Sequence, residues 1–115
     1  MLPVRKLAKK GQIENIFFRK HPDFSRVTLK TSGSLEYRFR KIKGGYVIDV
    51  FNLHKMPAHL VHIIDARAFN AEVKYIYPQK KDDIFKIYIK ASDEIAVRKS
   101  QDGVFINFDF FVPLL

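Results

Sequence analysis

The sequence predicts an all-β fold, a sandwich of two small antiparallel sheets that are related by an internal duplication. Eight or nine short apolar segments recur at regular spacing along the 115 residues, with turn-forming residues between them. No helical pattern of ten residues lies between these segments, which argues against βαβ units. The chain also repeats itself, because residues 23–32 (DFSRVTLKTS) resemble residues 83–92 (DIFKIYIKAS) at an offset of 60.

The repeat extends beyond that stretch. Leu35 matches Ile95 at the same offset, and a slip of two residues brings 45–50 (GYVIDV) onto 103–108 (GVFINF). One small sheet cannot bury its apolar face alone. We therefore expect each copy to form one sheet and the two sheets to face each other. The alternative interpretation is that two sets of amphipathic strands share their alternation by chance.

The chain is organised as one domain at residues 12–111, with repeat units at about 13–51 and 73–110. Residues 1–11 hold four basic residues and Pro3, which indicates a basic arm or a linker, and residues 112–115 form a tail or the start of a linker. In the first unit, period-2 alternation and turn residues predict strands at 13–18, 26–30, 35–40 and 46–51, with turns at 21–23 and 32–34 and a hairpin at 43–45.

The segment between the two units breaks the strand pattern. Pro57 opposes a long helix, so we expect residues 52–60 to be a linker with room for one helical turn, followed by a short strand at 61–66. The second unit then repeats the first, with strands at 72–77, 84–90, 95–99 and 104–110 and turns at 78–83, 92–94 and 101–103. In the last turn, Asp102 and Gly103 suit a type I′ connection.

The charge is strongly basic and unevenly distributed. The net charge is +9, and residues 1–43 carry twelve Lys and Arg against three acidic residues, whereas residues 44–115 carry nine of each. All of the excess therefore lies in the first part of the chain. It predicts an anionic partner, which is a nucleic acid, a lipid headgroup surface or an anionic polymer such as cell-wall glycan. The alternative is that the charge serves solubility alone.

Basic residues of the first unit are the candidate binding residues. Strand alternation places several of them on one sheet face, where they would form an anion-binding platform: Arg26, Lys30, Arg38, Arg40 and Lys43. Tyr37 and Phe39 point to the opposite face by the same alternation. Single-stranded nucleic acid prefers cations and aromatic rings on one surface. This pattern therefore counts against nucleic acid.

Asp49 interrupts an otherwise apolar strand. If its side chain faces inward it needs a partner, and Arg38 and Arg67 are the candidates. If it faces a solvated sheet surface it needs none. We favour a structural role for Asp49, with Asp49 and Arg67 as the candidate ion pair.

The sequence offers no catalytic constellation, so it predicts a protein that is not an enzyme and needs no cofactor. The chain has no cysteine, and the spacing of His54, His59 and His62 does not bring three metal ligands together. The paired carboxylates lie in predicted turns, where Asp is expected for turn geometry. No apolar run of 18 residues is present, so we expect no membrane span, and no apolar segment of a signal peptide follows Met1.

Three stretches of the sequence resemble the AMIN domain, which accompanies bacterial N-acetylmuramoyl-L-alanine amidases, pilus secretins and related envelope proteins. They are residues 47–50 (VIDV), 86–89 (KIYI) and 103–106 (GVFI), and the resemblance covers roughly residues 12–110. The family's fold, two symmetry-related sheets packed as a sandwich, agrees with the duplication found above. Lys86 departs from the family pattern, whose members often carry Arg there, and His54 and His59 have no place in it.

The resemblance implies a non-catalytic targeting module that binds peptidoglycan in the periplasm and is excised from a larger protein such as an amidase. Two alternative functions come from other classes. The first is a protein-interaction module of a secretion or pilus complex that uses an exposed sheet edge. The second is a basic β domain that binds nucleic acid, which ranks lower because the sequence holds no RNA-binding signature.

Overall fold

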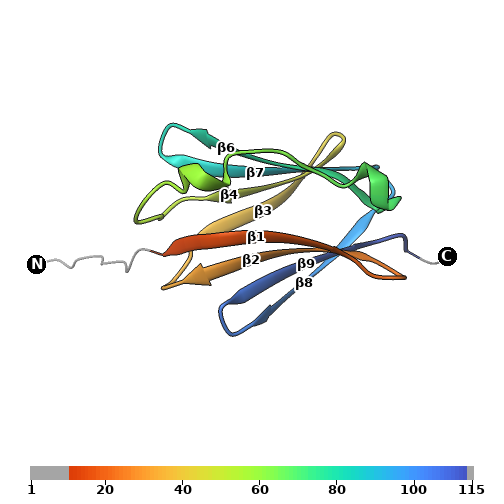
Figure 1. Ribbon diagram of the computed structural model, residues 1–115, viewed down its shortest axis with the longest axis horizontal. Helices are drawn as coiled ribbons and strands as arrows, with labels where there is room; N and C mark the ends of the chain where they lie inside the picture. Colours follow the sequence, from red (N-terminus) through yellow and green to blue (C-terminus); the bar gives the residue numbers. More distant parts are fainter. Residues whose placement is uncertain (1–10, 114–115) are drawn as a thin grey trace, which may run out of the picture.

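The computed structural model describes residues 11–113 and shows two antiparallel sheets stacked face to face, as the sequence predicts (Figure 1). The strands are β1 (Gln12–Lys20), β2 (Ser25–Ser32), β3 (Tyr37–Ile42), β4 (Gly45–Val50), β5 (Ile64–Asp65), β6 (Val73–Lys81), β7 (Ile84–Ala91), β8 (Ala96–Asp102) and β9 (Phe105–Phe111). The described chain also has two short 3-10 turns, η1 (Ala58–Leu60) and η2 (Arg67–Phe69). No helix in residues 11–113 is long and apolar enough to cross a membrane.

Each sheet takes strands from both halves of the chain. The four-stranded sheet has the order β1-β2-β9-β8, and the five-stranded sheet has the order β3-β4-β7-β6-β5. The hairpin β1–β2 therefore pairs with the hairpin β8–β9, and β3–β4 pairs with β6–β7. The prediction that each unit forms its own sheet is wrong, because strands that follow each other in one unit lie in different sheets.

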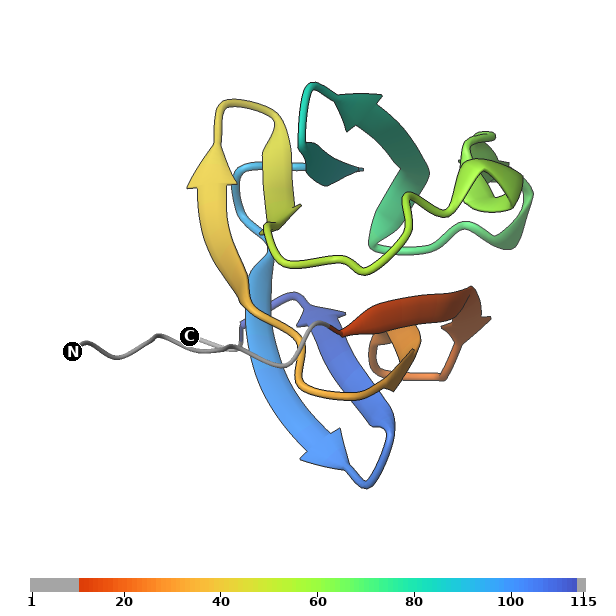
Figure 2. The ribbon, with the colours of Figure 1, turned by 90° about the vertical axis from the view of Figure 1, so that its left-hand side faces the viewer.

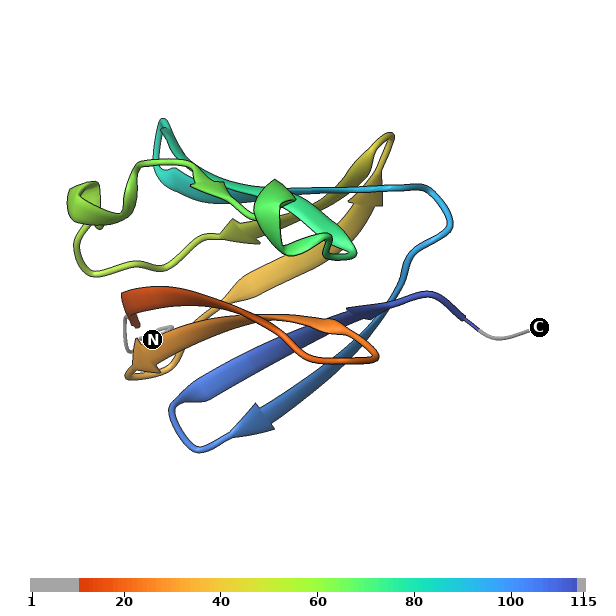
Figure 3. The same cartoon turned by 45° about the vertical axis from the view of Figure 1, so that its right-hand side comes forward.

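The chain passes from one sheet to the other in two connecting segments, one between β2 and β3 and one between β7 and β8. Figure 3 shows the β7–β8 connection, drawn in light blue, as it descends from one sheet to the other. Each segment carries one apolar residue that packs into the core, Leu35 in the first and Ile95 in the second. Burial of these side chains between the sheets stabilises a path from one sheet to the other. The predicted turns at 32–34 and 92–94 therefore belong to connections between sheets and not to hairpins.

The core lies between the sheets and follows from the period-2 alternation of the central strands. β4 and β7 direct Ile48, Val50, Phe85, Ile87 and Ile89 into it, and β2 and β9 supply Val27, Leu29, Ile106, Phe108 and Phe110. Phe39 joins the two sheets, because its ring stacks on Tyr46 at 5.1 Å and on Phe108 at 4.9 Å between centroids. Such interdigitation of two apolar faces is what holds a sandwich together.

The linker between β4 and β6 covers one side of the sandwich, whereas β3 and β8 lie at the opposite side (Figure 2). Its apolar residues Leu53, Met56 and Leu60 pack against the core. The expected helical turn is η1, a 3-10 turn that begins directly after Pro57. The strand expected at 61–66 is reduced to β5.

β6 is longer than the sequence predicts, since it continues through Pro78 to Lys81 where a turn was expected. Pro78 lies opposite Ile87 of β7, while β5 pairs only with Tyr75 and Ile76. At Pro78 the strand is therefore a sheet edge, where a missing N–H costs no ladder hydrogen bond. The turn itself is Asp82–Asp83, with Asp82 in a left-handed conformation at φ 56°.

Gly11, the first described residue and the last residue of the predicted arm, is bound to the linker that follows β4. Its N–H donates to the Asn52 carbonyl at 3.2 Å, and its carbonyl accepts from the His54 N–H at 2.9 Å. A Cβ at this position would lie 2.6 Å from the Ser34 carbonyl oxygen, so the site requires glycine. The remainder of the predicted arm, residues 1–10, lies outside the described residues, as do residues 114–115 of the predicted tail.

Candidate binding site on the five-stranded sheet

The outer face of the five-stranded sheet carries a carboxylate surrounded by cations. Asp49 in β4 is fully buried, yet it points away from the core, because its neighbours Ile48 and Val50 point inward. Its Oδ1 accepts from Lys86 Nζ at 2.7 Å, and its Oδ2 accepts from Arg40 Nε at 2.9 Å and Arg38 Nη2 at 3.2 Å. We call these four residues the Asp49 cluster.

The register of the strands explains the Asp49 cluster. Arg38 of β3 and Lys86 of β7 are the direct cross-strand partners of Asp49, one on each side, and Arg40 lies two residues along β3 from Arg38. Burial alone would raise the pKa of Asp49. The hydrogen bonds from Arg40, Lys86 and Arg38 outweigh that effect and lower its pKa from 3.8 to about 2.

The Asp49 cluster has more positive than negative charge. Three cations share one carboxylate, and the side chains of Arg38 and Arg40 remain 61% and 42% exposed. A guanidinium group has five N–H donors, so both arginines keep donors that face solvent. The arrangement can bind a carboxylate or phosphate group, for which guanidinium geometry is well suited.

Beside the Asp49 cluster lies a shallow groove of about 400 Å³ that we call the tyrosine groove. Its lining residues are Ile63, Tyr75, Tyr77, Tyr88 and Lys90. The rings of Tyr77 and Tyr88 lie 6.2 Å apart between centroids and are tilted by 38°. The groove therefore presents aromatic ring faces next to a lysine.

One row of cross-strand partners connects the tyrosine groove with the Asp49 cluster. Tyr77 lies opposite Tyr88, Tyr88 opposite Val47, and Val47 opposite Arg40. Val47 is fully buried although it lies outside the core cluster, so neighbouring side chains cover the centre of this face. The row spans three strand spacings of about 4.8 Å, or about 14 Å in all.

The structure separates the predicted basic platform into two faces. Arg38 and Arg40 belong to the five-stranded sheet, whereas Arg26 and Lys30 lie on β2 of the four-stranded sheet. Lys43 is exposed in the turn between β3 and β4. The prediction of one shared face is wrong because alternation defines the side of a strand but not the sheet to which it belongs.

The predicted pair of Asp49 with Arg67 is also corrected, since Arg38, the other candidate, is among the residues that bind Asp49. Arg67 follows β5 and binds Asp65 instead, with Nη2 to Oδ2 at 2.8 Å and Nε to Oδ1 at 3.0 Å. Its guanidinium group lies 5.0 Å from the ring centroid of Tyr75. Asp65 is only two residues from Arg67 in the sequence and is therefore a nearer partner than Asp49. The side chains of Asp65 and Arg67 remain largely exposed.

The outer face of the four-stranded sheet carries a second buried carboxylate, Asp109 of β9. Arg26 binds it through two hydrogen bonds, Nε to Oδ1 at 2.7 Å and Nη2 to Oδ2 at 2.9 Å. Arg98 of β8 lies at 3.9 Å. Along the same face Thr28 donates to the Asn107 side chain at 2.7 Å, so these polar groups bind each other.

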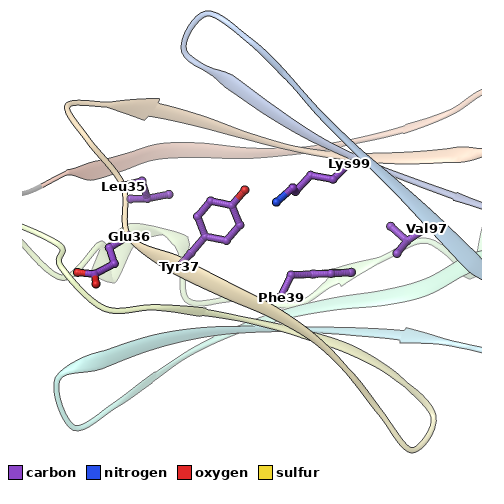
Figure 4. A pocket seen from close by; sticks show the side chains of 6 residues that line it. All are labelled: Leu35, Glu36, Tyr37, Phe39, Val97 and Lys99. Carbon is purple, nitrogen blue, oxygen red and sulfur yellow. The ribbon is translucent and has the colours of Figure 1, made fainter.

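A larger hollow of about 600 Å³ opens between the edges of the two sheets at β3 and β8 (Figure 4). Tyr37 and Phe39 of β3 and Val97 and Lys99 of β8 point into it. Lys99 Nζ lies 5.3 Å from the Tyr37 ring centroid, which bridges the opening by a cation–π contact. The hollow is the open side of the core and carries one acidic residue, Glu36.

Residues 11–113 contain no group of three or more His, Asp or Glu side chains that could hold a metal ion. Comparison of the sequence with known protein families and with curated proteins found no match.

Proposed function

We propose that this protein is a non-catalytic module that binds peptidoglycan, an anionic polymer of the bacterial cell wall, through the outer face of its five-stranded sheet. The observation that carries this proposal is the Asp49 cluster, in which three cations share one buried carboxylate on a face open to solvent. The local surplus of positive charge attracts an anionic polymer, and the exposed guanidinium groups can donate to its carboxylates.

The resemblance to the AMIN domain supports the same proposal. Two of the stretches that carry it, residues 47–50 and 86–89, belong to β4 and β7, which pair at the centre of the five-stranded sheet. Both contribute to the Asp49 cluster, through Asp49 and Lys86. We therefore propose membership of that family and, with it, a place in the periplasm.

We also propose that the chain arose by duplication with a constant offset of 60 residues. Asp49 lies between Arg38 and Lys86, and Asp109 lies between Arg98 and Arg26. The first pairing ladder of each half is irregular at a matching place, between Ile13 and Asn15 and between Val73 and Tyr75. These correspondences support a duplication without the two-residue slip, which would align Asp49 with Asn107.

The test of wall binding is co-sedimentation with isolated peptidoglycan sacculi at physiological salt. We expect the parent protein to sediment and the variant Arg38→Gln/Arg40→Gln to remain in the supernatant. Glutamine avoids a new negative charge beside Asp49, which keeps Lys86 as a partner. The matched control, Arg19→Gln/Lys30→Gln, removes two charges from the four-stranded sheet and should sediment like the parent. A parent protein that stays in the supernatant would exclude this function.

Binding of single-stranded nucleic acid is the second candidate. The argument against it came from Tyr37 and Phe39, which point inward, but Tyr77 and Tyr88 share the outer face with Arg40. Cations and aromatic rings on one surface satisfy the requirement for base stacking. This candidate predicts affinity for oligothymidine that falls steeply with salt. An absence of binding at low salt would remove it.

A further inference from the structure

We infer that the tyrosine groove is a subsite for sugar rings, and that it binds the glycan strand of an acidic polysaccharide whose carboxylates lie over Arg40 and Arg38. This inference rests on the proposed function and names the chemistry of its ligand. Neutral sugar rings lie at the tyrosine end of the row of cross-strand partners, and acidic groups lie at the Arg40 end. The Asp49 cluster then attracts the polymer, and the tyrosine groove recognises it as a saccharide.

The first argument is the character of the groove surface. Tyr77 is 43% exposed and Ile63 is 55% exposed, so large apolar side chains lie open at this place. Aromatic rings pack against the apolar C–H faces of pyranose rings, while the tyrosine hydroxyls can hydrogen-bond to sugar hydroxyl groups. The volume of about 400 Å³ falls within the usual range for small-ligand sites.

The second argument is that the fold does not require these tyrosines. The residues at the corresponding ladder positions of the four-stranded sheet are Asn15, Phe17 and Thr28, where the five-stranded sheet has Tyr75, Tyr77 and Tyr88. Asn15 accepts the Ile16 N–H through its Oδ1, and Thr28 donates to the Asn107 side chain of the neighbouring strand. The four-stranded sheet keeps one exposed ring at these positions, Phe17, and has a hollow of about 420 Å³ there, but it lacks the paired rings of Tyr77 and Tyr88. A sheet of the same construction therefore forms without paired tyrosines, which indicates that the pair serves a ligand.

The third argument separates a saccharide from a nucleic acid. A nucleic-acid strand carries a phosphate at every nucleotide, so its groove needs cations along its whole length. Lys90 is the one cation among the residues that line the tyrosine groove. Arg67 lies 5.0 Å from the Tyr75 ring but is paired with Asp65, whereas three cations gather around Asp49 at the far end of the row. An uncharged segment beside an acidic one matches this distribution better.

The experiment uses chitotetraose, a neutral β-1,4-linked tetramer of N-acetylglucosamine, as the soluble probe. Isothermal titration calorimetry measures binding in the parent and in every variant, because the variants below remove two of the three groove tyrosines whose fluorescence would otherwise report it. We expect Tyr77→Ala/Tyr88→Ala to weaken chitotetraose binding about tenfold or more. Tyr77→Phe/Tyr88→Phe keeps the ring faces and should retain most of the affinity. The matched control on the other sheet, Phe17→Ala/Thr28→Ala, should leave it unchanged.

The outcomes distinguish this inference from the proposed function. If the parent protein sediments with sacculi but does not bind chitotetraose, or if Tyr77→Ala/Tyr88→Ala binds it like the parent, the sugar subsite is wrong while wall binding stands. If Arg38→Gln/Arg40→Gln loses sacculi but keeps chitotetraose, both proposals are supported. The inference is overturned in favour of nucleic acid if oligothymidine binds to the parent, if the double variant Tyr77→Ala/Tyr88→Ala loses this binding, and if no saccharide competes for the site. A thermal unfolding midpoint near that of the parent establishes that each variant is folded.

Discussion

The outer faces of the two sheets share one arrangement of charges, which we call the ionic frame, and differ in the side chains around it. Each has a buried aspartate on a central strand with a cation on both neighbouring strands: Asp49 with Arg38 and Lys86, and Asp109 with Arg98 and Arg26. A buried carboxylate is stable only with close partners, so these ion pairs link the central strand of each sheet to both of its neighbours. A feature present on both faces is part of the fold, and a feature present on one face is the candidate for function.

The differences concern both charge and surface. Asp49 has a third cation, Arg40, whereas the corresponding position on β8 is Ser100. Around Asp109 the neighbouring polar groups bind each other, as Thr28 does with Asn107. Around Asp49 the neighbours are Tyr77, Tyr88 and Lys90, which line an open groove. The four-stranded sheet also has a hollow, of about 420 Å³, but its lining residues Arg26, Thr28 and Asn107 bind partners within that sheet. The polar groups of the two faces therefore differ more than their shapes, and the difference favours the five-stranded sheet as the proposed binding face.

The largest effect should come from removing the two carboxylates in turn. We expect Asp49→Ala to lower the free energy of unfolding by about 3–5 kcal/mol, since it leaves Lys86, whose side chain is only 14% exposed, without its partner. Asp109→Ala should cost less, about 2 kcal/mol, because the partially exposed Arg26 and exposed Arg98 can turn to solvent. Urea denaturation at pH 7 measures both. An equal or reversed order would show that the exposure of the cations does not determine the cost of losing the carboxylate.

Acid should affect the Asp49 cluster next. The folded protein holds the pKa of Asp49 at about 2, below its ordinary value of 3.8. A lowered folded-state pKa contributes stability that is present above the unfolded value and is lost as the pH falls through the folded value. Asp49 should account for about 2 kcal/mol of the stability that the parent loses between pH 4 and pH 2. Asp49→Asn removes this contribution, so its stability should fall less steeply over the same interval, which denaturation at several pH values will measure.

Alternation in the sequence was enough to predict the strands but not their partners. Strict period 2 identifies β2, β3 and β7, since Val27, Phe39 and Ile87 must face one way and their polar neighbours the other. Which strands pair depends on contacts distant in sequence. Leu35 and Ile95, the apolar residues directly after the predicted turns, fit equally well as the first residues of strands in the same sheet, and only the structure shows that they pack between the sheets. The exchange of hairpins could therefore not be predicted from alternation.

The site was predicted in part for the same reason. Arg38, Arg40 and Asp49 were recognised because charge is conspicuous in an apolar pattern, and they lie together. Tyr77 and Tyr88 were missed although each alternates with core isoleucines, as in Tyr75-Ile76-Tyr77 and Ile87-Tyr88-Ile89. Alternation shows that such tyrosines face outward. Only the pairing of β6 with β7, β7 with β4 and β4 with β3 brings them into one row with Arg40.

The smallest effect tests how each frame chooses its cation. At matching ladder positions Asp109 is bound by Arg26 and Asp49 by Lys86. Lysine suffices beside Asp49 because Arg38 and Arg40 donate to its other oxygen, whereas Arg98 is too distant, at 3.9 Å, to do so for Asp109. Arg26→Lys replaces two hydrogen bonds with one and should cost about 1 kcal/mol in urea denaturation. Lys30→Ala, which breaks only the exposed 3.9 Å contact with Glu14, is the control and should change stability by less than about 0.5 kcal/mol. A neutral Arg26→Lys would mean that the bidentate geometry at Asp109 is dispensable and that one donor per buried carboxylate is enough for either sheet.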